Sequence, residues 1–320
     1  MLNLVTGAGG FVGAALCASL LADGQEVIGI LRPGEVTWRM SDNSLVGLNT
    51  EHYDITDPSF SSVIERLRPA RIFHLAAHGA YSWQNDPVAI VTANLTATIQ
   101  LADAAAKAGC EAFVHTGSSS EYGLKDVPHN EDDRIMPNSV YAASKAAATL
   151  YLGHLARTKV LPAVTARLFS VYGPFEDRSR LIPQVVVQGR SGAIPPLASP
   201  TIARDFVYVD DAVQCLRTLS ETLASEAFPS EVVNICSGIE TTLADVASAS
   251  AGVFDLKVDP VWGTYEARVW DTNKWSGNPD LAASALGFQA TTNIAHGLRR
   301  FSDWIGTNDN RLSYYENLNS

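Results

Sequence analysis

The chain of 320 residues is 46% hydrophobic and 18% charged, a composition that can bury a large core and excludes a disordered chain. Its 34 acidic residues outnumber its 23 basic residues, which leaves a formal net charge of −11. That balance argues against nucleic acid and anionic membrane surfaces as partners, because both are bound through clusters of basic side chains. A few arginines can still form a local phosphate site.

The first half of the chain alternates short apolar runs with longer runs that have helical periodicity. We predict buried strands at residues 2–6, 26–31, 71–77, 112–118 and 164–169. We predict helices between them at residues 11–22, 88–108 and 139–157. Strands that alternate with helices form βαβ units, whose strands lie parallel in one sheet. The predicted fold class is therefore α/β, a Rossmann-type doubly wound parallel sheet with a smaller C-terminal substrate-binding region.

After residue 170 the alternation weakens, and four prolines divide the shorter elements, at Pro183, Pro195, Pro196 and Pro200. We predict a dinucleotide-binding domain of residues 1–170, and a substrate region of residues 171–204 and 236–311. Residues 205–235 are expected to return to the first domain. Residues 312–320 are expected to form a frayed tail.

The chain has four cysteines, Cys17, Cys110, Cys215 and Cys236. No CxxC pair or histidine spacing completes a metal site, so we expect reduced core thiols and no metal. The first residues do not resemble a signal peptide, and no apolar run approaches the ~18 residues of a membrane span. We therefore expect a cytoplasmic protein.

Three glycines with a spacing of three, Gly7, Gly10 and Gly13, lie between the first predicted strand and the first predicted helix. In a dinucleotide site such glycines permit a sharp turn, a close approach of the backbone to the pyrophosphate, and close packing of the helix on the sheet. The helix start, at Phe11 and Val12, then offers unpaired N–H groups to the phosphates. This loop predicts a dinucleotide site.

The residue that follows the second predicted strand bears on the choice of cofactor. An acidic residue there would bind the ribose hydroxyls of NAD, but this chain has Arg32. A guanidinium can bind the 2′-phosphate of NADP, although Arg32 could also be a solvated loop residue. NADP is therefore favoured over NAD.

Tyr141 and Lys145 are four residues apart in a predicted helix, and so lie on one face. A phenol with a pKa of ~10 is a poor acid–base group at neutral pH unless a neighbouring ammonium stabilises its phenolate. Ser118 ends the fourth predicted strand, and the carboxyl end of a parallel strand faces the ligand crevice. We predict that Ser118, Tyr141 and Lys145 are catalytic.

These residues, in this order and spacing, resemble the extended short-chain dehydrogenase/reductases, the NAD-dependent epimerase/dehydratase family that acts on nucleotide sugars. Residues 204–211 and 234–238 match further motifs of that family. The resemblance implies additional cofactor-binding residues, namely Asp54, Ile55, Leu75, Ala76, Ala77 and Asn94. It implies substrate-binding residues at His78, Ser119, Ser120, Ser170, Arg204 and Arg268. Of these, the two arginines would hold the nucleotide diphosphate. The resemblance also implies a homodimer, formed by a four-helix contact through the helices at residues 88–108 and 139–157.

The chain departs from the family pattern in two places. Relatives that dehydrate the sugar carry Asp-Glu, or the Glu, directly after the catalytic hydroxyl, whereas this chain has Ser119 and Ser120. Elimination of water needs an acid and a base there, so dehydration is disfavoured. Glu121 comes one residue later and is expected to point elsewhere. Ser170 replaces an asparagine that contacts substrate in relatives.

The reading that we favour from sequence is NADPH-dependent reduction of the 4-keto group of a nucleotide-linked 6-deoxy sugar. Tyr141 would protonate the nascent alkoxide, Ser118 would bind the same oxygen, and Lys145 would lower the Tyr141 pKa and bind the nicotinamide ribose. Residues 118–123 also resemble GDP-4-keto-6-deoxy-mannose reductases. The first alternative is an NAD-dependent C4 epimerase with the same residues, and the second is a non-catalytic nucleotide sensor. Trp83 and Trp262 are candidates for the sugar site or for the core.

Overall fold

A seven-stranded sheet forms the centre of the computed structural model, which describes residues 1–35, 37–225, 228–263 and 274–316. Across the sheet the strands are β10 (Val232–Ile235), β6 (Ala163–Leu168), β5 (Ala112–Ser118), β4 (Arg71–His74), β1 (Leu2–Thr6), β2 (Glu26–Leu31) and β3 (Asn49–His52). Each neighbouring pair is parallel. The structure therefore confirms the doubly wound parallel sheet.

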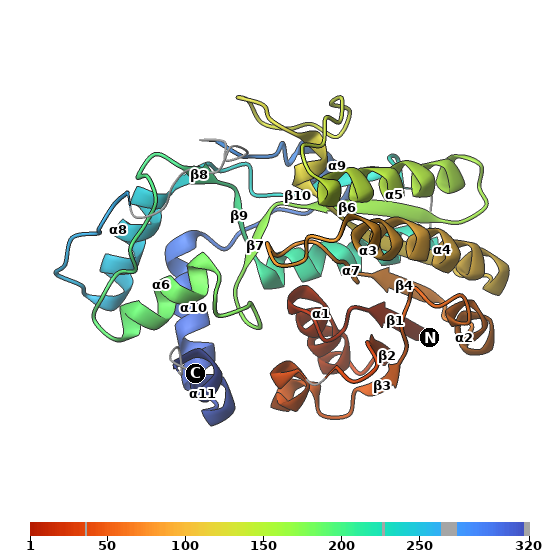
Figure 1. Ribbon diagram of the computed structural model, residues 1–320, viewed down its shortest axis with the longest axis horizontal. Coiled ribbons are helices and arrows are strands. Elements are labelled where there is room, and N and C mark those ends of the chain that lie inside the picture. Colours follow the sequence, from red (N-terminus) through yellow and green to blue (C-terminus); the bar gives the residue numbers. More distant parts are fainter. Residues whose placement is uncertain (36, 226–227, 264–273, 317–320) are drawn as a thin grey trace.

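Helices cover both faces of this sheet (Figure 1). On one face lie α1 (Phe11–Ala22) and α7 (Val209–Ser225), and on the other lie α2 (Phe60–Leu67), α4 (Ala97–Ala108) and α5 (Val140–Arg157). Successive side chains of a strand point to opposite faces. Leu4 and Val5, adjacent in β1, accordingly belong to different cores.

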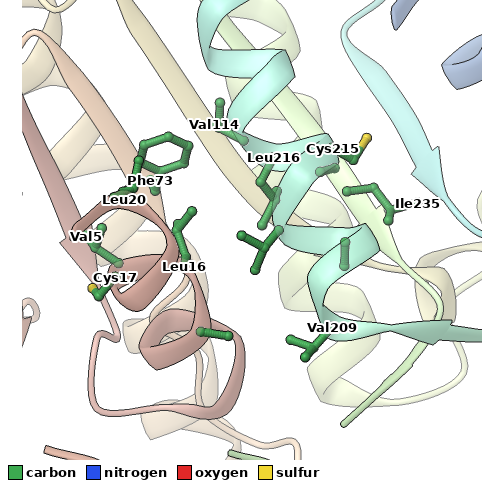
Figure 2. Close-up of a cluster of buried hydrophobic side chains, with 14 of the residues drawn as sticks. Val5, Leu16, Cys17, Leu20, Phe73, Val114, Val209, Cys215, Leu216 and Ile235 are labelled. Atoms are coloured by element: carbon green, nitrogen blue, oxygen red, sulfur yellow. The ribbon is translucent and has the colours of Figure 1, made fainter. Parts of the chain in front are cut away.

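The core under α1 and α7 joins the two helices through aliphatic side chains (Figure 2). Leu16 and Leu20 of α1 and Leu216 of α7 are buried with Val5 and Phe73 of the sheet. All four cysteines are buried and unpaired, in agreement with the sequence prediction of core thiols.

A continuous helical run from Pro87 to Ala108 leads to β5 and comprises α3 (Pro87–Val91), a π-helical turn (Thr92–Thr96) and α4. Its 22 residues are long and apolar enough, by length and composition, to cross a membrane. The run packs on the sheet, however, with Leu101, Ala105 and Thr98 buried. It is thus built as a core helix.

The C-terminal half adds a second group of elements, at the left of Figure 1. Its helices are α6 (Leu181–Arg190), α8 (Leu243–Phe254), α10 (Ile294–Gly306) and α11 (Asp309–Glu316), whereas α9 (Asp280–Leu286) lies near β10 and packs with the core under α1 and α7. Two short strand pairs accompany them: β7 (Ser170–Tyr172) with β9 (Phe206–Tyr208), and β8 (Ala203–Arg204) with β11 (Thr241–Thr242). Four of the helices, α6, α8, α10 and α11, share a core around Val185, Val246, Phe301 and Tyr315.

Within residues 205–235, α7 packs on the sheet and β10 pairs with β6 at its edge. The division of the chain into two domains stays a prediction.

The prediction of a frayed tail from residue 312 is wrong for residues 312–316, which belong to α11. Tyr315 is fully buried and donates a hydrogen bond to the Glu176 carbonyl at 2.6 Å. Arg311 forms a 2.6 Å ion pair with buried Asp42. The polar composition of this segment hides these long-range contacts. Residues 317–320 lie outside the described part of the chain.

Candidate active site

Two adjoining hollows lie at the carboxyl ends of β1, β4 and β5. The β2-side pocket has a volume of about 570 Å³ and includes Arg32 and Asp54, and the β5-side pocket has a volume of about 860 Å³ and includes Ser118 and Tyr141. They share four lining residues, Gly7, Gly10, Leu75 and Ala77. Strand β1 has β2 on one side and β4 on the other, and such a switch point is where open parallel sheets bind ligands.

The glycine loop has the geometry that the sequence predicted. Gly7 has φ +71°, and a Cβ atom there would lie 2.7 Å from the Ala76 nitrogen. A Cβ atom on Gly13 would lie 2.1 Å from the Gly7 carbonyl oxygen. The first turn of α1 can therefore pack this closely on the glycine loop only because residue 13 has no side chain. No side chain caps α1 at Gly10, and Phe11, Val12 and Gly13 line the β5-side pocket. The loop and helix start fit a pyrophosphate.

The β2-side pocket has a carboxylate that the sequence reasoning missed. After β2 the chain turns at Gly34 (φ +72°), and the Glu35 N–H donates to the Arg32 carbonyl at 3.0 Å. The Glu35 carboxylate then accepts the Arg32 N–H at 3.1 Å and lines the pocket beside Arg32. The glycine-containing turn was the available sequence signal, because it brings the third residue after Arg32 back to the end of the strand.

The remaining cofactor residues predicted for this pocket divide into two groups. Asp54, Ile55, Leu75, Ala76 and Ala77 line it. Asn94 is buried instead, where its side chain bonds both backbone groups of His78 at 2.8 Å and the Ser144 hydroxyl at 2.9 Å. Asn94 therefore holds the segment after β4 against α5.

Ser118, Tyr141 and Lys145 come together in the β5-side pocket. Ser118 ends β5, and α5 begins directly after Ser139, whose hydroxyl caps it by accepting the Ala142 N–H at 3.1 Å. This cap fixes where the first turn of α5 places Tyr141. Two chain segments that are far apart in sequence thus meet across the pocket.

Burial sets the titration of the phenol and the amine. It raises the pKa of Tyr141 to about 12, with a further increase from Glu121, while a hydrogen bond from Ser118 and the charge of Arg180 act in the opposite direction. Burial lowers the pKa of Lys145 to about 8, against the Glu121 carboxylate, which raises it.

The expectation that Lys145 lowers the pKa of Tyr141 stays a prediction, because burial and Glu121 are what raise that pKa in this structure. The Lys145 ammonium instead donates to His115 Nε2 at 3.0 Å, on the strand beneath the pocket. The spacing of four residues predicted a shared helix face, but it did not reveal this competing acceptor.

The serines after Ser118 have different surroundings. Ser120 lines the β5-side pocket and its hydroxyl is 2.8 Å from that of Ser118. Ser119 is buried and accepts a hydrogen bond from Trp275 Nε1 at 2.8 Å. Glu121 points into the core, as predicted, where it accepts bonds from the Ser118 N–H at 2.8 Å and from Arg167 Nε at 2.9 Å. Among the described residues that line this pocket there is no carboxylate.

Several predicted substrate residues lie elsewhere. His78 lines the β2-side pocket, whereas Ser170 and Arg204 are outside the described linings of both pockets. Ser170 pairs with Phe206 between β7 and β9, and Arg204 bonds the Ala203 carbonyl at 2.8 Å. Arg268 lies outside the described residues.

The structure adds lining residues of the β5-side pocket that carried no recognisable sequence signal: Tyr81, Arg180 and Trp275. The Arg180 guanidinium lies 5.3 Å from the centre of the Tyr81 ring. Trp83 is largely exposed and stacks on Tyr81, with the two ring centres 4.5 Å apart. Trp262 lines a separate hollow beside α8.

A parallel sheet with a glycine loop at its switch point, and a serine, tyrosine and lysine in the adjoining pocket, defines a dinucleotide-dependent enzyme of the extended short-chain dehydrogenase/reductase type. The profile of the NAD-dependent epimerase/dehydratase family matches residues 3–236. The chain belongs to this family, and it is an NAD(P)-dependent nucleotide-sugar enzyme.

The chain is similar to characterised proteins over nearly its whole length. It is 30% identical to the UDP-glucose 4-epimerase of Mycolicibacterium smegmatis, over 94% of this chain and 97% of that protein. It is 24% identical to dTDP-glucose 4,6-dehydratase 1 of Escherichia coli, over 95% and 92% of the two chains. Its fold matches the crystal structure of UDP-glucuronic acid 4-epimerase from Bacillus cereus, solved with UDP-glucuronic acid and NAD, with a TM-score of 0.82, 25% identity and coverage of 96% and 99%. The family is NAD-dependent, so the comparisons do not support the predicted preference for NADP.

Proposed function

We propose that this protein is an NAD-dependent C4 epimerase of a nucleoside diphosphate sugar. The observation that carries this proposal is the β5-side pocket, which combines Ser118, Tyr141 and Lys145 and has no carboxylate among its described lining residues. Oxidation and reduction at one carbon require a single proton-transferring group beside the cofactor. Dehydration requires a further acid and base, which Ser119 and Ser120 do not provide.

The surroundings of Glu35 support NAD as the cofactor. Its carboxylate lies at the end of β2, within a turn that also contains Arg32. A carboxylate there can accept hydrogen bonds from ribose hydroxyls, whereas it would repel the 2′-phosphate of NADP. The NADPH-dependent reduction that we favoured from sequence depended on Arg32, and it loses its main support once Glu35 stands beside that arginine.

In this mechanism Tyr141 moves the proton of the sugar 4-hydroxyl. NAD, when bound, would supply reversible hydride transfer at C4. Ser118 donates a hydrogen bond to the reacting oxygen, which orients it and stabilises its negative charge. Because burial raises the pKa of Tyr141 to about 12, the phenol needs a nearby cation to act as a base, and Lys145 and Arg180 are the described cations of this pocket. When the hydride would return to C4 from the opposite sugar face, Tyr141 would give the proton back to the C4 oxygen, which would complete epimerisation.

Arg180 also bears on the sugar. Similar proteins include epimerases of UDP-glucose and of UDP-glucuronate. A guanidinium in the sugar pocket would pair with a 6-carboxylate in two parallel hydrogen bonds and gains nothing comparable from a 6-hydroxyl. UDP-glucuronate is therefore the substrate that we propose to test first, with UDP-glucose second.

The test begins with the dinucleotide that copurifies, identified by absorbance and mass. The protein is then incubated with NAD and each UDP-sugar, and inversion at C4 is followed by proton NMR. We expect a mixture of the two C4 epimers with no net formation of NADH. A product that has lost water would instead identify a dehydratase, and stoichiometric oxidation of NADPH with a 4-keto sugar would identify the reductase.

A further inference from the structure

Two histidines lie side by side beneath the β5-side pocket, and the proposed mechanism uses neither. His74 of β4 and His115 of β5 are paired in register, with ring centres 5.5 Å apart. Both are fully buried, and burial lowers the pKa of His74 to about 3 and that of His115 well below its usual range. Both imidazoles are therefore uncharged at neutral pH.

The two rings have different hydrogen-bond partners. His74 lies between hydroxyls, with Nδ1 2.7 Å from Thr6 Oγ1 and Nε2 2.8 Å from Thr98 Oγ1. His115 has Nδ1 3.2 Å from Thr165 Oγ1, but its Nε2 is 3.0 Å from Lys145 Nζ. An ammonium can only donate, so His115 Nε2 accepts and its Nδ1–H donates to Thr165. The contact to Lys145 thus selects one tautomer of His115.

We propose that His115 is a positioning residue for Lys145: a neutral imidazole that accepts a hydrogen bond from the buried ammonium and holds it at the floor of the pocket. The side chain of Lys145 is almost completely buried, and a buried ammonium without an acceptor is strongly disfavoured. His115 therefore keeps Lys145 both charged and in place. This inference rests on the role of Lys145 in the proposed function.

The other groups that face Lys145 have defined charges. Glu121, from the turn after β5, is an anion that raises the Lys145 pKa. His74 on β4 is neutral, and Tyr141 on α5 itself is neutral because its own pKa is raised. Loss of the His115 acceptor removes stabilisation from the charged form of the amine, so the Lys145 pKa must fall.

The test measures Lys145 directly, in protein without substrate. Lysine labelled with ¹³C at Cε is titrated by NMR, and the Lys145 signal is assigned with Lys145→Met. His115→Phe removes the acceptor, whereas His115→Gln retains an oxygen that can accept. His74→Phe is the matched control, because His74 is equally buried on the adjacent strand but bonds Thr6 and Thr98 rather than Lys145.

We expect the Lys145 pKa in His115→Phe to fall by about one unit, the size of a charge-assisted hydrogen bond. His115→Gln should recover most of that shift, and His74→Phe should leave the pKa unchanged. In an active enzyme, the alkaline limb of the kcat/KM profile should move to lower pH by the same amount in His115→Phe. If His115→Phe does not fold, His115→Met, which is of similar size and a weak acceptor, takes its place.

An unchanged Lys145 pKa in His115→Phe would overturn the proposal, as would an equal shift in His74→Phe. Because the NMR titration needs no turnover, it separates this inference from the proposed function. A shifted pKa in a protein without epimerase activity would leave the positioning role standing and refute the epimerase. Epimerase activity together with an unchanged Lys145 pKa in His115→Phe would support the epimerase and refute the positioning role of His115.

Discussion

At Tyr141, burial opposes the chemistry that the side chain has to perform. The pKa of the phenol is raised to about 12, whereas the amine of Lys145 has its pKa lowered to about 8. At neutral pH the site without ligand therefore holds a protonated phenol and a mostly protonated amine. The proton on the phenol is the one that the proposed reaction transfers.

Tyr141→Phe removes this proton and little else. We expect turnover to fall by at least about 10²-fold, the usual contribution of a general acid–base group, with NAD affinity changed less than about threefold. Epimerisation is measured by NMR and NAD binding by fluorescence titration. Tyr151→Phe is a suitable control, because Tyr151 lies on the same helix but bonds Asp103 outside the pocket. Comparable turnover in both variants would exclude Tyr141 as the proton-transferring group.

In our proposal Glu35 determines the preference for NAD over NADP, and its neutral isostere glutamine tests that role. Glu35→Gln removes the charge that repels a 2′-phosphate and weakens the bonds to ribose hydroxyls. We expect the ratio of NAD affinity to NADP affinity to fall by about tenfold, measured by titration with both dinucleotides. Arg32→Ala is compared in the same assay. A larger change in that variant than in Glu35→Gln would restore Arg32 as the cofactor-selecting residue.

The strand β5, the turn after it, β6 and α5 are joined by one buried ion pair. Glu121 accepts from Arg167 Nε at 2.9 Å, from Thr149 Oγ1 at 3.0 Å and from the Ser118 N–H at 2.8 Å. Arg167 also lies 4.3 Å from the centre of the Tyr122 ring. Since both charges are buried, neither can replace its partner with water. The pair therefore fixes the turn that carries Ser118.

Arg167→Met leaves the Glu121 carboxylate buried without its cation. We expect the free energy of unfolding to fall by about 3–5 kcal/mol, measured by urea denaturation. Glu121→Gln combined with Arg167→Met should recover part of this loss, because the amide oxygen still accepts the Ser118 N–H. The exposed pair of Arg66 and Glu51 provides the control, and Arg66→Met should change stability far less. Losses that simply add in the double variant would show that the two charges are not coupled.

Over the whole molecule, α11 adds contacts between the C-terminal half and the cofactor half beyond those that α7, α9 and β10 make with the sheet. Trp38, close in sequence to the cofactor turn, stacks on Tyr314 at 4.1 Å, and Arg311 pairs with Asp42. Arg39 Nε also donates to the Phe175 carbonyl at 2.6 Å. These contacts join α11 and Phe175 to the segment between β2 and β3. The homodimer and the cytoplasmic location remain predictions.

The predicted dimer contact can be tested on the exposed apolar side chains of the helices concerned. Val88 of α3 and Val140 and Leu150 of α5 are exposed, and burial against a second copy would remove them from water. We expect Leu150→Glu to convert a dimer into a monomer, measured by light scattering after size exclusion. Leu124→Glu, at an exposed leucine outside these helices, should not change the mass. A wild-type protein that is already monomeric at all concentrations would refute the contact.

Sequence by itself determined the parallel sheet, the glycine loop and the membership of Ser118, Tyr141 and Lys145 in one site. These depend on local periodicity and on short spacings, because a strand end, a helix face and a tight turn each involve only a few consecutive residues. Glu121 does lie outside the pocket, but strand alternation is not the reason: Ser119–Tyr122 form a 3-10 helix, and Glu121 turns back to accept the Ser118 N–H at its start.

Tertiary structure decided what depends on distant segments. Glu35 lies at the end of β2 because the chain turns back there. Arg180 and Trp275, from the second half of the chain, line the β5-side pocket. His115 accepts a hydrogen bond from the ammonium of Lys145. Burial, which shifts the pKa of Tyr141, Lys145 and His115, is a property of everything packed around a side chain. The spacing of residues along the chain does not predict burial, and only the folded protein shows which acceptor forms a hydrogen bond with a buried charge.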